Sequence, residues 1–89
     1  MIDRSLMVTL LTLLDDRRDL AGGVEENQLF NEINLRSTGR PVTTDLLNEH
    51  LSMAQEKGWI DWKLDLLKSR RWRITPPGAS ALADLKEGG

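Results

Sequence analysis

The residues that could support catalysis are few and are not grouped along the chain. There is one histidine, His50, and no cysteine, so the sequence offers neither a thiolate nor a second imidazole for a metal site. The carboxylates of Asp15, Asp16 and Asp19 stand at the end of a predicted helix, where solvated charges are common. No serine lies in a nucleophile-elbow pattern beside a general base. We therefore predict no catalytic residue, no metal, no cofactor and no enzymatic activity, and we expect His50 to be a packing or surface residue.

Basic residues, by contrast, gather in one stretch of an acidic chain. The formal net charge is −2, from 12 Lys and Arg against 14 Asp and Glu. Six of the cations, but only Asp61 and Asp65 among the anions, fall between Lys57 and Arg73. A basic patch on an otherwise acidic molecule can orient it on a phosphate backbone. The distribution of charge, more than its sum, therefore indicates a nucleic-acid partner.

All three tryptophans lie in the same basic stretch. Trp62 and Trp72 alternate with charged neighbours, whereas Trp59 is out of phase with them. Aromatic side chains on a small sheet can stack on the bases of a single strand. They can also fill the core beneath the sheet, and the alternation favours this second interpretation for Trp62 and Trp72. We expect Trp59 to pack on the helices.

The region from 41 to 75 changes its period halfway along. Leu47, Leu51 and Ala54 recur at helical spacing after a threonine cap, which predicts a helix over about 43–57 that Gly58 can close. Apolar and charged residues then alternate with a period of two. This alternation predicts a hairpin over about 59–75, with a charged tip.

Three further helices are predicted, over about 2–18, 25–35 and 77–86. The apolar run near the start of the chain is far shorter than the roughly 20 residues that a membrane span needs, and it lacks the basic flank and cleavage site of a signal peptide. We expect no membrane association and a cytoplasmic location. We expect the broad apolar face of this helix to be covered either by the core of its own domain or by a second copy of the chain. A homodimer through the first and last helices is therefore an alternative that the sequence does not decide. Residues 1–89 fit one domain.

Two phrases of the chain carry a resemblance to a known class of proteins. The first, Leu51–Ile60, ends a helix with Lys-Gly-Trp-Ile, and the second, Trp72–Gly78, reads Trp-Arg-Ile-Thr-Pro-Pro-Gly. Together with the hairpin between them they make the segment from Asn27 to Leu85 resemble winged-helix transcription regulators, and most of all a family of small winged-helix proteins encoded in Mu-like prophages. The resemblance implies an α+β, mostly α fold: a winged helix-turn-helix with three helices, a two-stranded wing hairpin and a C-terminal helix.

The resemblance also implies double-stranded DNA as the partner and a phage or bacterial transcription regulator as the function. The third helix would enter the major groove, and the wing would lie on the backbone or in the minor groove. The candidate contacts are polar side chains on the third helix, arginines in the turn before it, and cations of the wing. They are Thr43, Thr44, Asn48 and Ser52; Arg36 and Arg40; and Lys68, Arg70, Arg71 and Arg73.

Two features depart from this pattern and keep an alternative open. Asp45, Glu49 and Glu56 make the exposed side of the third helix acidic, so we expect the wing and the turn to carry most of the binding, with a steep dependence on salt. Leu66 and Leu67 in the wing are not explained by DNA binding. The alternative is a winged-helix module that binds a protein partner, of an assembly or anti-repressor type. Leucines folded under the wing and arginines pointing outward together would favour DNA.

Overall fold

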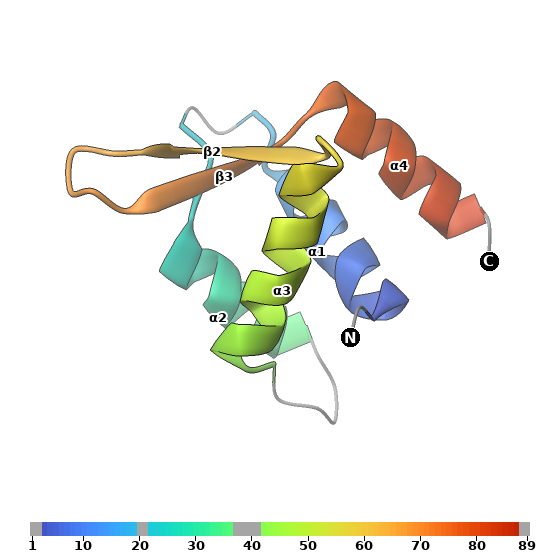
Figure 1. The fold of residues 1–89 in the computed structure, drawn as a ribbon, viewed down its shortest axis with the longest axis horizontal. Coiled ribbons are helices and arrows are strands. Elements are labelled where there is room, and N and C mark those ends of the chain that lie inside the picture. The colour runs from blue at the N-terminus through green and yellow to red at the C-terminus, as the bar shows by residue number, and fades with distance from the viewer. Residues whose placement is uncertain (1–2, 20–21, 37–41, 88–89) are drawn as a thin grey trace.

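Three helices lie on one side of a three-stranded antiparallel sheet, and a fourth leads away from its base, in the computed structural model, which describes residues 3–19, 22–36 and 42–87 (Figure 1). This part of the chain is a small, mostly helical α+β structure, as the sequence predicts. Within it, no helix has the length and apolar character needed to cross a membrane. The elements are α1 (Arg4–Asp16), β1 (Val24–Glu25), α2 (Glu26–Arg36), α3 (Thr44–Glu56), β2 (Ile60–Leu64), β3 (Arg70–Ile74) and α4 (Pro76–Glu87).

The sheet contains a strand that the sequence analysis missed. The sequence predicts that the second helix begins at about Glu25 and that the wing hairpin has two strands only. Val24 and Glu25 instead form β1, in which Val24 pairs with Trp72, so that the strand order is β1-β3-β2. Gly23 makes this pairing possible, because a Cβ at its position would lie 2.6 Å from the carbonyl oxygen of Trp72.

The first helix is covered by the chain's own core. Leu10, Leu11 and Leu13 have no exposed surface, and α1 packs against α2, β3 and α4. The broad apolar face that left a dimer open in the sequence is thus filled within one chain. Among the described residues, sixteen apolar side chains make up the core; they are Leu6, Met7, Leu10, Leu11, Leu13, Leu14, Val24, Leu29, Ile33, Val42, Leu47, Leu51, Ala54, Ile60, Trp72 and Leu82.

His50 is a fully buried member of this interior and ties α3 to the start of α1. Its Nε2 accepts a hydrogen bond of 2.9 Å from the backbone N–H of Asp3, and its Nδ1 lies 2.8 Å from the carbonyl oxygen of Leu46. Because the backbone N–H can only donate, Nε2 is the acceptor and Nδ1 carries the proton. Both ring nitrogens of this buried side chain have hydrogen-bond partners, which agrees with the packing role expected from the sequence.

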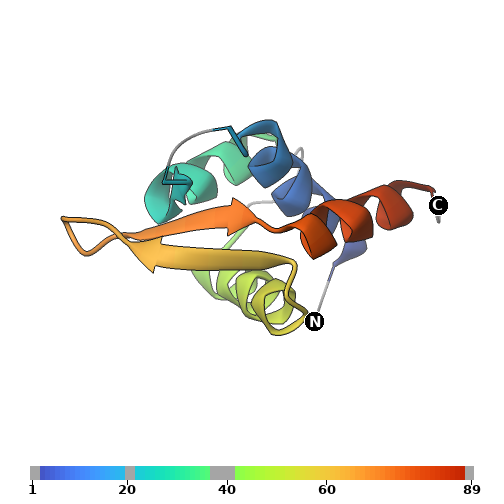
Figure 2. The ribbon, with the colours of Figure 1, turned by 90° about the horizontal axis from the view of Figure 1, so that it is seen from above.

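Thr75 joins the base of the hairpin to the helices on either side of it. Its backbone N–H donates to the carbonyl oxygen of Trp59 at 2.9 Å, and its hydroxyl accepts from the N–H of Gly78 at 3.1 Å, which caps α4. A Cβ on Gly78 would lie 1.9 Å from the Trp59 oxygen, so only glycine fits here. Figure 2 shows that the hairpin and α4 extend in opposite directions from this junction.

Candidate nucleic-acid interface

The outer part of the hairpin projects beyond the helices (Figure 1). Ile60 and Trp72 are buried at its base, but Trp62 is 36% exposed and Leu64 is 59% exposed. The expectation that Trp62 packs into the core with Trp72 is therefore wrong, because Trp62 lies on the edge strand β2, whereas its cross-strand partner Trp72 lies on the central strand β3. Trp62 instead lies beside Trp72 on the sheet, with ring centroids 6.2 Å apart. Trp59 is partly buried against the core, as expected.

Each arginine of the hairpin is held by a carboxylate. Arg70 lies 2.7 Å from Glu26, Arg71 lies 3.1 Å from Asp65, and Arg73 lies 3.8 Å from Asp61. Arg71 also donates to the carbonyl oxygen of Gly23 at 3.2 Å. Their side chains remain 36–44% exposed. The arginines are consequently accessible to solvent, but they do not present an unpaired positive surface.

Glu26 stands at the point where the hairpin meets the helices. Its carboxylate pairs with Arg70 and accepts from the indole Nε1 of Trp72 at 3.3 Å. It also borders a hollow of about 260 Å³ between α2 and α3, together with Thr44 and Asn48. Three of the predicted DNA contacts, Thr44, Asn48 and Arg70, are thus connected to Glu26, two by lining the same hollow and one by an ion pair.

The tip of the hairpin is a turn built on Asp65. One of its carboxylate oxygens accepts from the backbone N–H of Leu67 at 2.8 Å and of Ser69 at 2.9 Å, and the other accepts from Nε of Arg71 at 3.1 Å. These bonds, with that from Ser69 the strongest cause, hold the pKa of Asp65 below its ordinary value. The N–H of Lys68 donates to the Asp65 carbonyl at 3.0 Å and closes the turn.

Two lysines of the hairpin are exposed and form no ion pair with any described residue, namely Lys63 on β2 and Lys68 at the tip. Lys68 has a φ of 61°, in the left-handed region that glycine or asparagine usually occupies at this place in a hairpin. Lys63 faces Arg71 across the strands and was not among the predicted contacts. Its alternation with the apolar residues of β2 was the signal that could have identified it.

The predicted contacts at α3 are of two kinds, a capping threonine and a row of exposed polar side chains. Thr43 is the N-cap, and its hydroxyl accepts from the N–H of Leu46 at 3.1 Å, so this oxygen already has a partner. Thr44, Asn48 and Ser52 are exposed at a spacing of four residues, which places them on one side of the helix. The neighbouring exposed row carries the carboxylates of Asp45, Glu49 and Glu56. The exposed side of α3 is therefore polar and acidic.

Arg36 lies away from the hairpin. It ends α2 and reaches Asp16 at 3.7 Å, whereas Glu26, the partner of Arg70, begins the same helix. At 1.5 Å per residue the two ends of α2 are about 15 Å apart. The N–H of Val42 donates to the side chain of Asn34 at 2.9 Å, which does place the entry to α3 beside the last turns of α2, as expected. Arg40 falls outside the described residues.

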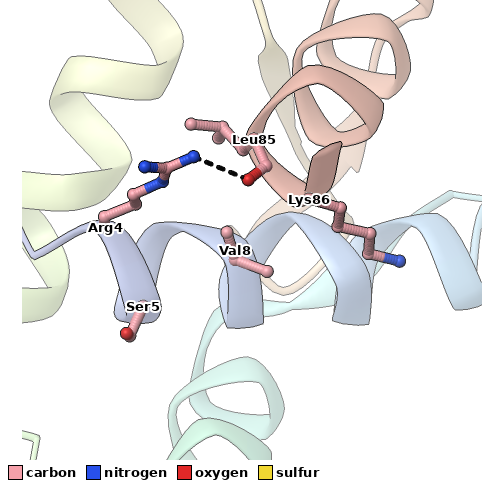
Figure 3. Close-up of a pocket in the computed structure, with 5 residues that line it drawn as sticks. All are labelled: Arg4, Ser5, Val8, Leu85 and Lys86. Carbon is pink, nitrogen blue, oxygen red and sulfur yellow. Dashed lines mark hydrogen bonds between the residues drawn. The ribbon is translucent and has the colours of Figure 1, made fainter. Parts of the chain in front are cut away.

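Two of the other hollows are lined by residues of both α1 and α4. The larger, of about 390 Å³, is lined by Arg4, Ser5, Val8, Leu85 and Lys86 (Figure 3). Arg4 donates to the Leu85 carbonyl at 2.8 Å. The same two residues also line a smaller hollow of about 200 Å³, to which Met53 and Trp59 contribute. Neither is lined by a carboxylate, histidine or cysteine, and no described residues form a group of His, Cys, Asp or Glu that could hold a metal ion.

The described structure thus defines a small α+β domain with a projecting, cation-bearing hairpin as its candidate site. Comparisons of the chain with protein-family models, with curated proteins and with solved structures find no match.

Proposed function

We propose that this chain is a winged-helix domain that binds double-stranded DNA, and that it acts as a transcription regulator of the phage or bacterial kind that its sequence resembles. The order of its elements supports this fold: a hairpin follows the third helix, and its second strand pairs back onto a short strand before α2. One observation carries the proposed function. The hairpin extends beyond the helices with two unpaired lysines and three partly exposed arginines.

The arginine ion pairs can be exchanged for phosphate contacts. Ion pairs between solvent-exposed side chains contribute only about 0–1 kcal/mol, because water screens them and ordering the side chains costs entropy. A guanidinium can bind a phosphate with two parallel hydrogen bonds, which compensates for the lost carboxylate. Glu26 is the carboxylate most directly in the way, since it holds Arg70 and borders the hollow beside Thr44 and Asn48.

The test is a titration of a fluorescently labelled random-sequence duplex, followed by anisotropy at low and at moderate salt. We expect salt-sensitive binding by the unaltered protein. Lys63→Gln/Lys68→Gln should weaken it and lower the slope of log K against log salt by roughly 0.9 per lost phosphate contact. Neither lysine forms an ion pair with a described residue, so this variant removes charge without breaking a contact of the fold.

A second variant should move the affinity the other way. Glu26→Gln frees Arg70 from its ion pair while keeping an oxygen for the Trp72 indole, so we expect tighter binding. Arg70→Ala/Arg71→Ala should weaken binding, with circular dichroism showing that the fold survives the loss of the Arg71 bonds. Arg18→Ala is the matched control, because Arg18 is an exposed, ion-paired arginine that follows α1 and does not belong to the hairpin. Absence of binding at low salt, or an equal loss with Arg18→Ala, would contradict the proposal.

A second candidate function is supported by the apolar side chains of the hairpin. Trp62, Leu64, Leu66 and Leu67 are the exposed large hydrophobic residues of this element. A winged-helix module that binds a protein partner instead of DNA, of the assembly or anti-repressor type, would use such a surface. This candidate predicts no binding to duplex DNA at low salt, together with partner binding that is lost in Leu66→Ser/Leu67→Ser.

A further inference from the structure

Two leucines stand at the apex of the hairpin with no contact to cover them. Leu66 is fully exposed and Leu67 is 86% exposed. They occupy the two central positions of the turn that the Lys68 N–H closes on the Asp65 carbonyl. Because the hairpin extends past the helices, nothing in the described part of the chain lies near enough to bury them (Figure 1).

The turn holds these leucines in a fixed position. Asp65 accepts from the N–H of Leu67 and of Ser69, and its second carboxylate oxygen is bound by Arg71, which is itself anchored to the carbonyl of Gly23. The tip is therefore tied to β1 through an arginine as well as to β2 and β3. A side chain presented by an ordered turn loses little conformational entropy when it binds. The two leucines are in this sense prepared for a contact.

The charges around the apex are of one sign. Asp65 is the only carboxylate between Trp62 and Trp72, and its oxygens are engaged by the turn and by Arg71. The side chains left outward beside the leucines are those of Lys63 and Lys68. An apolar apex between cations complements a groove that has phosphates along its rims and stacked bases at its floor. The surface of an anionic membrane also combines negative charge with an apolar interior. Binding to it would, however, be a second function of the hairpin in addition to the proposed DNA binding.

We propose that Leu66 and Leu67 form a wedge that enters the minor groove and partly unstacks a base step, so that the protein bends the duplex it binds. This inference rests on the proposed DNA binding and adds to it. Apolar wedges of this kind kink DNA by about 20–90° toward the major groove. Lys63 and Lys68 hold the phosphates on either side of the wedge. Pyrimidine–purine steps unstack most easily, so the bend is largest where the apex meets a TA step.

The experiment measures bending and affinity on the same duplex. A short duplex with a central TA step, labelled with a donor and an acceptor at its two ends, is titrated with the full chain at low salt, while anisotropy reports binding. We expect energy transfer to rise on binding, by the amount that a bend of about 20–90° produces. Leu66→Ser/Leu67→Ser should bind with an unchanged salt slope but leave the transfer efficiency at that of free duplex. Leu35→Ser is the matched control, since Leu35 is 83% exposed on α2, and it should bend DNA like the unaltered protein.

The outcomes separate the wedge from the function on which it rests. Binding without a rise in energy transfer, or a rise that the leucine variant retains, overturns the wedge and leaves DNA binding in place. No binding at low salt overturns both. Vesicles of anionic phospholipid are titrated in parallel with both proteins. Leucine-dependent binding to vesicles, with duplex bending unaffected by the leucine variant, would assign the apex to a membrane surface and overturn the wedge.

Discussion

The leucines of α1 and those of the hairpin apex are the same side chain in opposite surroundings. Leu10, Leu11 and Leu13 are fully buried, whereas Leu66 is fully exposed and Leu67 nearly so. Burying a leucine contributes about 1.5–3 kcal/mol to folding, so the first group stabilises the domain and the second contributes almost nothing. The free energy of burying the apex leucines is still available for binding. The chain thus uses leucine both in its core and on its surface, and only the core leucines stabilise the fold.

The largest expected effect is on the buried side of this comparison. Leu13→Ala should lower the free energy of unfolding by about 2–5 kcal/mol, because it removes buried apolar atoms and leaves a cavity that α1 cannot close. Equilibrium denaturation in urea, followed by circular dichroism, measures this loss. For a domain of 89 residues such a loss is a large part of the whole stability. A change below about 1 kcal/mol would show that α1 is not packed as described.

A somewhat smaller loss is expected at the base of the hairpin. Gly78→Ala places a methyl group 1.9 Å from the carbonyl oxygen of Trp59, so α4 must shift away from the strand. We expect a cost of about 1–3 kcal/mol in the same denaturation experiment. Ser80→Ala, two residues further along α4 and exposed, is the control and should change stability little. Equal stability of both variants would argue against the close approach of α4 to Trp59.

At the tip, acid should loosen the turn without unfolding the domain. The folded-state pKa of Asp65 is lowered from 3.8, so its contribution to tip order is present above that value and is lost as pH falls through the lower, folded-state pKa. Amide signals of Leu67 and Ser69 in NMR spectra should therefore shift below about pH 3.8 while core signals stay in place. In Asp65→Asn the same amides should already differ at neutral pH and should not titrate. Simultaneous loss of tip and core signals in the unaltered protein would contradict a local role.

The smallest effect on stability is expected at the apex itself. Leu66→Ser/Leu67→Ser should change the free energy of unfolding by no more than about 0.5 kcal/mol, because both side chains are exposed to water in the folded as well as in the unfolded chain. The urea experiment used for Leu13→Ala gives a direct comparison. A loss of several kcal/mol would mean that the leucines are buried in solution, for example against a second copy, and would erase the contrast between the two groups.

Much of the helical part of the fold could be predicted from local spacing. The helices at 4–16 and 44–56 lie within the predicted ranges 2–18 and 43–57. Apolar residues that recur at helical spacing over several turns identify both helices, and the capping threonine marks the start of the second. Ile2, at the predicted start of the first helix, is outside the described residues. The strand β1 could not be found, because two residues are too short to show a repeating pattern. The close approach of Gly23 to Trp72 depends on this pairing and has no local signal either.

The surroundings of the candidate site were harder to predict. The alternation of β2 was recognised, but which of its residues are buried depends on whether the strand lies at the edge or in the middle of the sheet, and a local pattern does not contain the strand order. The ion pair between Arg70 and Glu26 joins residues far apart in the sequence. The cations of the basic stretch could therefore be counted from the sequence, but their pairing with carboxylates could not be predicted. The apex leucines were identified as unexplained, and the structure places them outside with the arginines paired, which is not the arrangement expected for a simple phosphate clamp.

The Thr75 junction gives the hairpin a mechanical character. Besides its bonds to Trp59 and Gly78, the Thr75 hydroxyl donates to the carbonyl of Gly58, so one residue fastens the end of α3, the start of β2 and the first turn of α4. The hairpin is consequently fixed firmly at its base, whereas the side chains of Leu66 and Leu67 at its apex are exposed. A force on Leu66 or Leu67 has its greatest leverage at Thr75. A displacement of the hairpin would therefore be transmitted to the end of α3 and the start of α4 together, because both are hydrogen-bonded to Thr75.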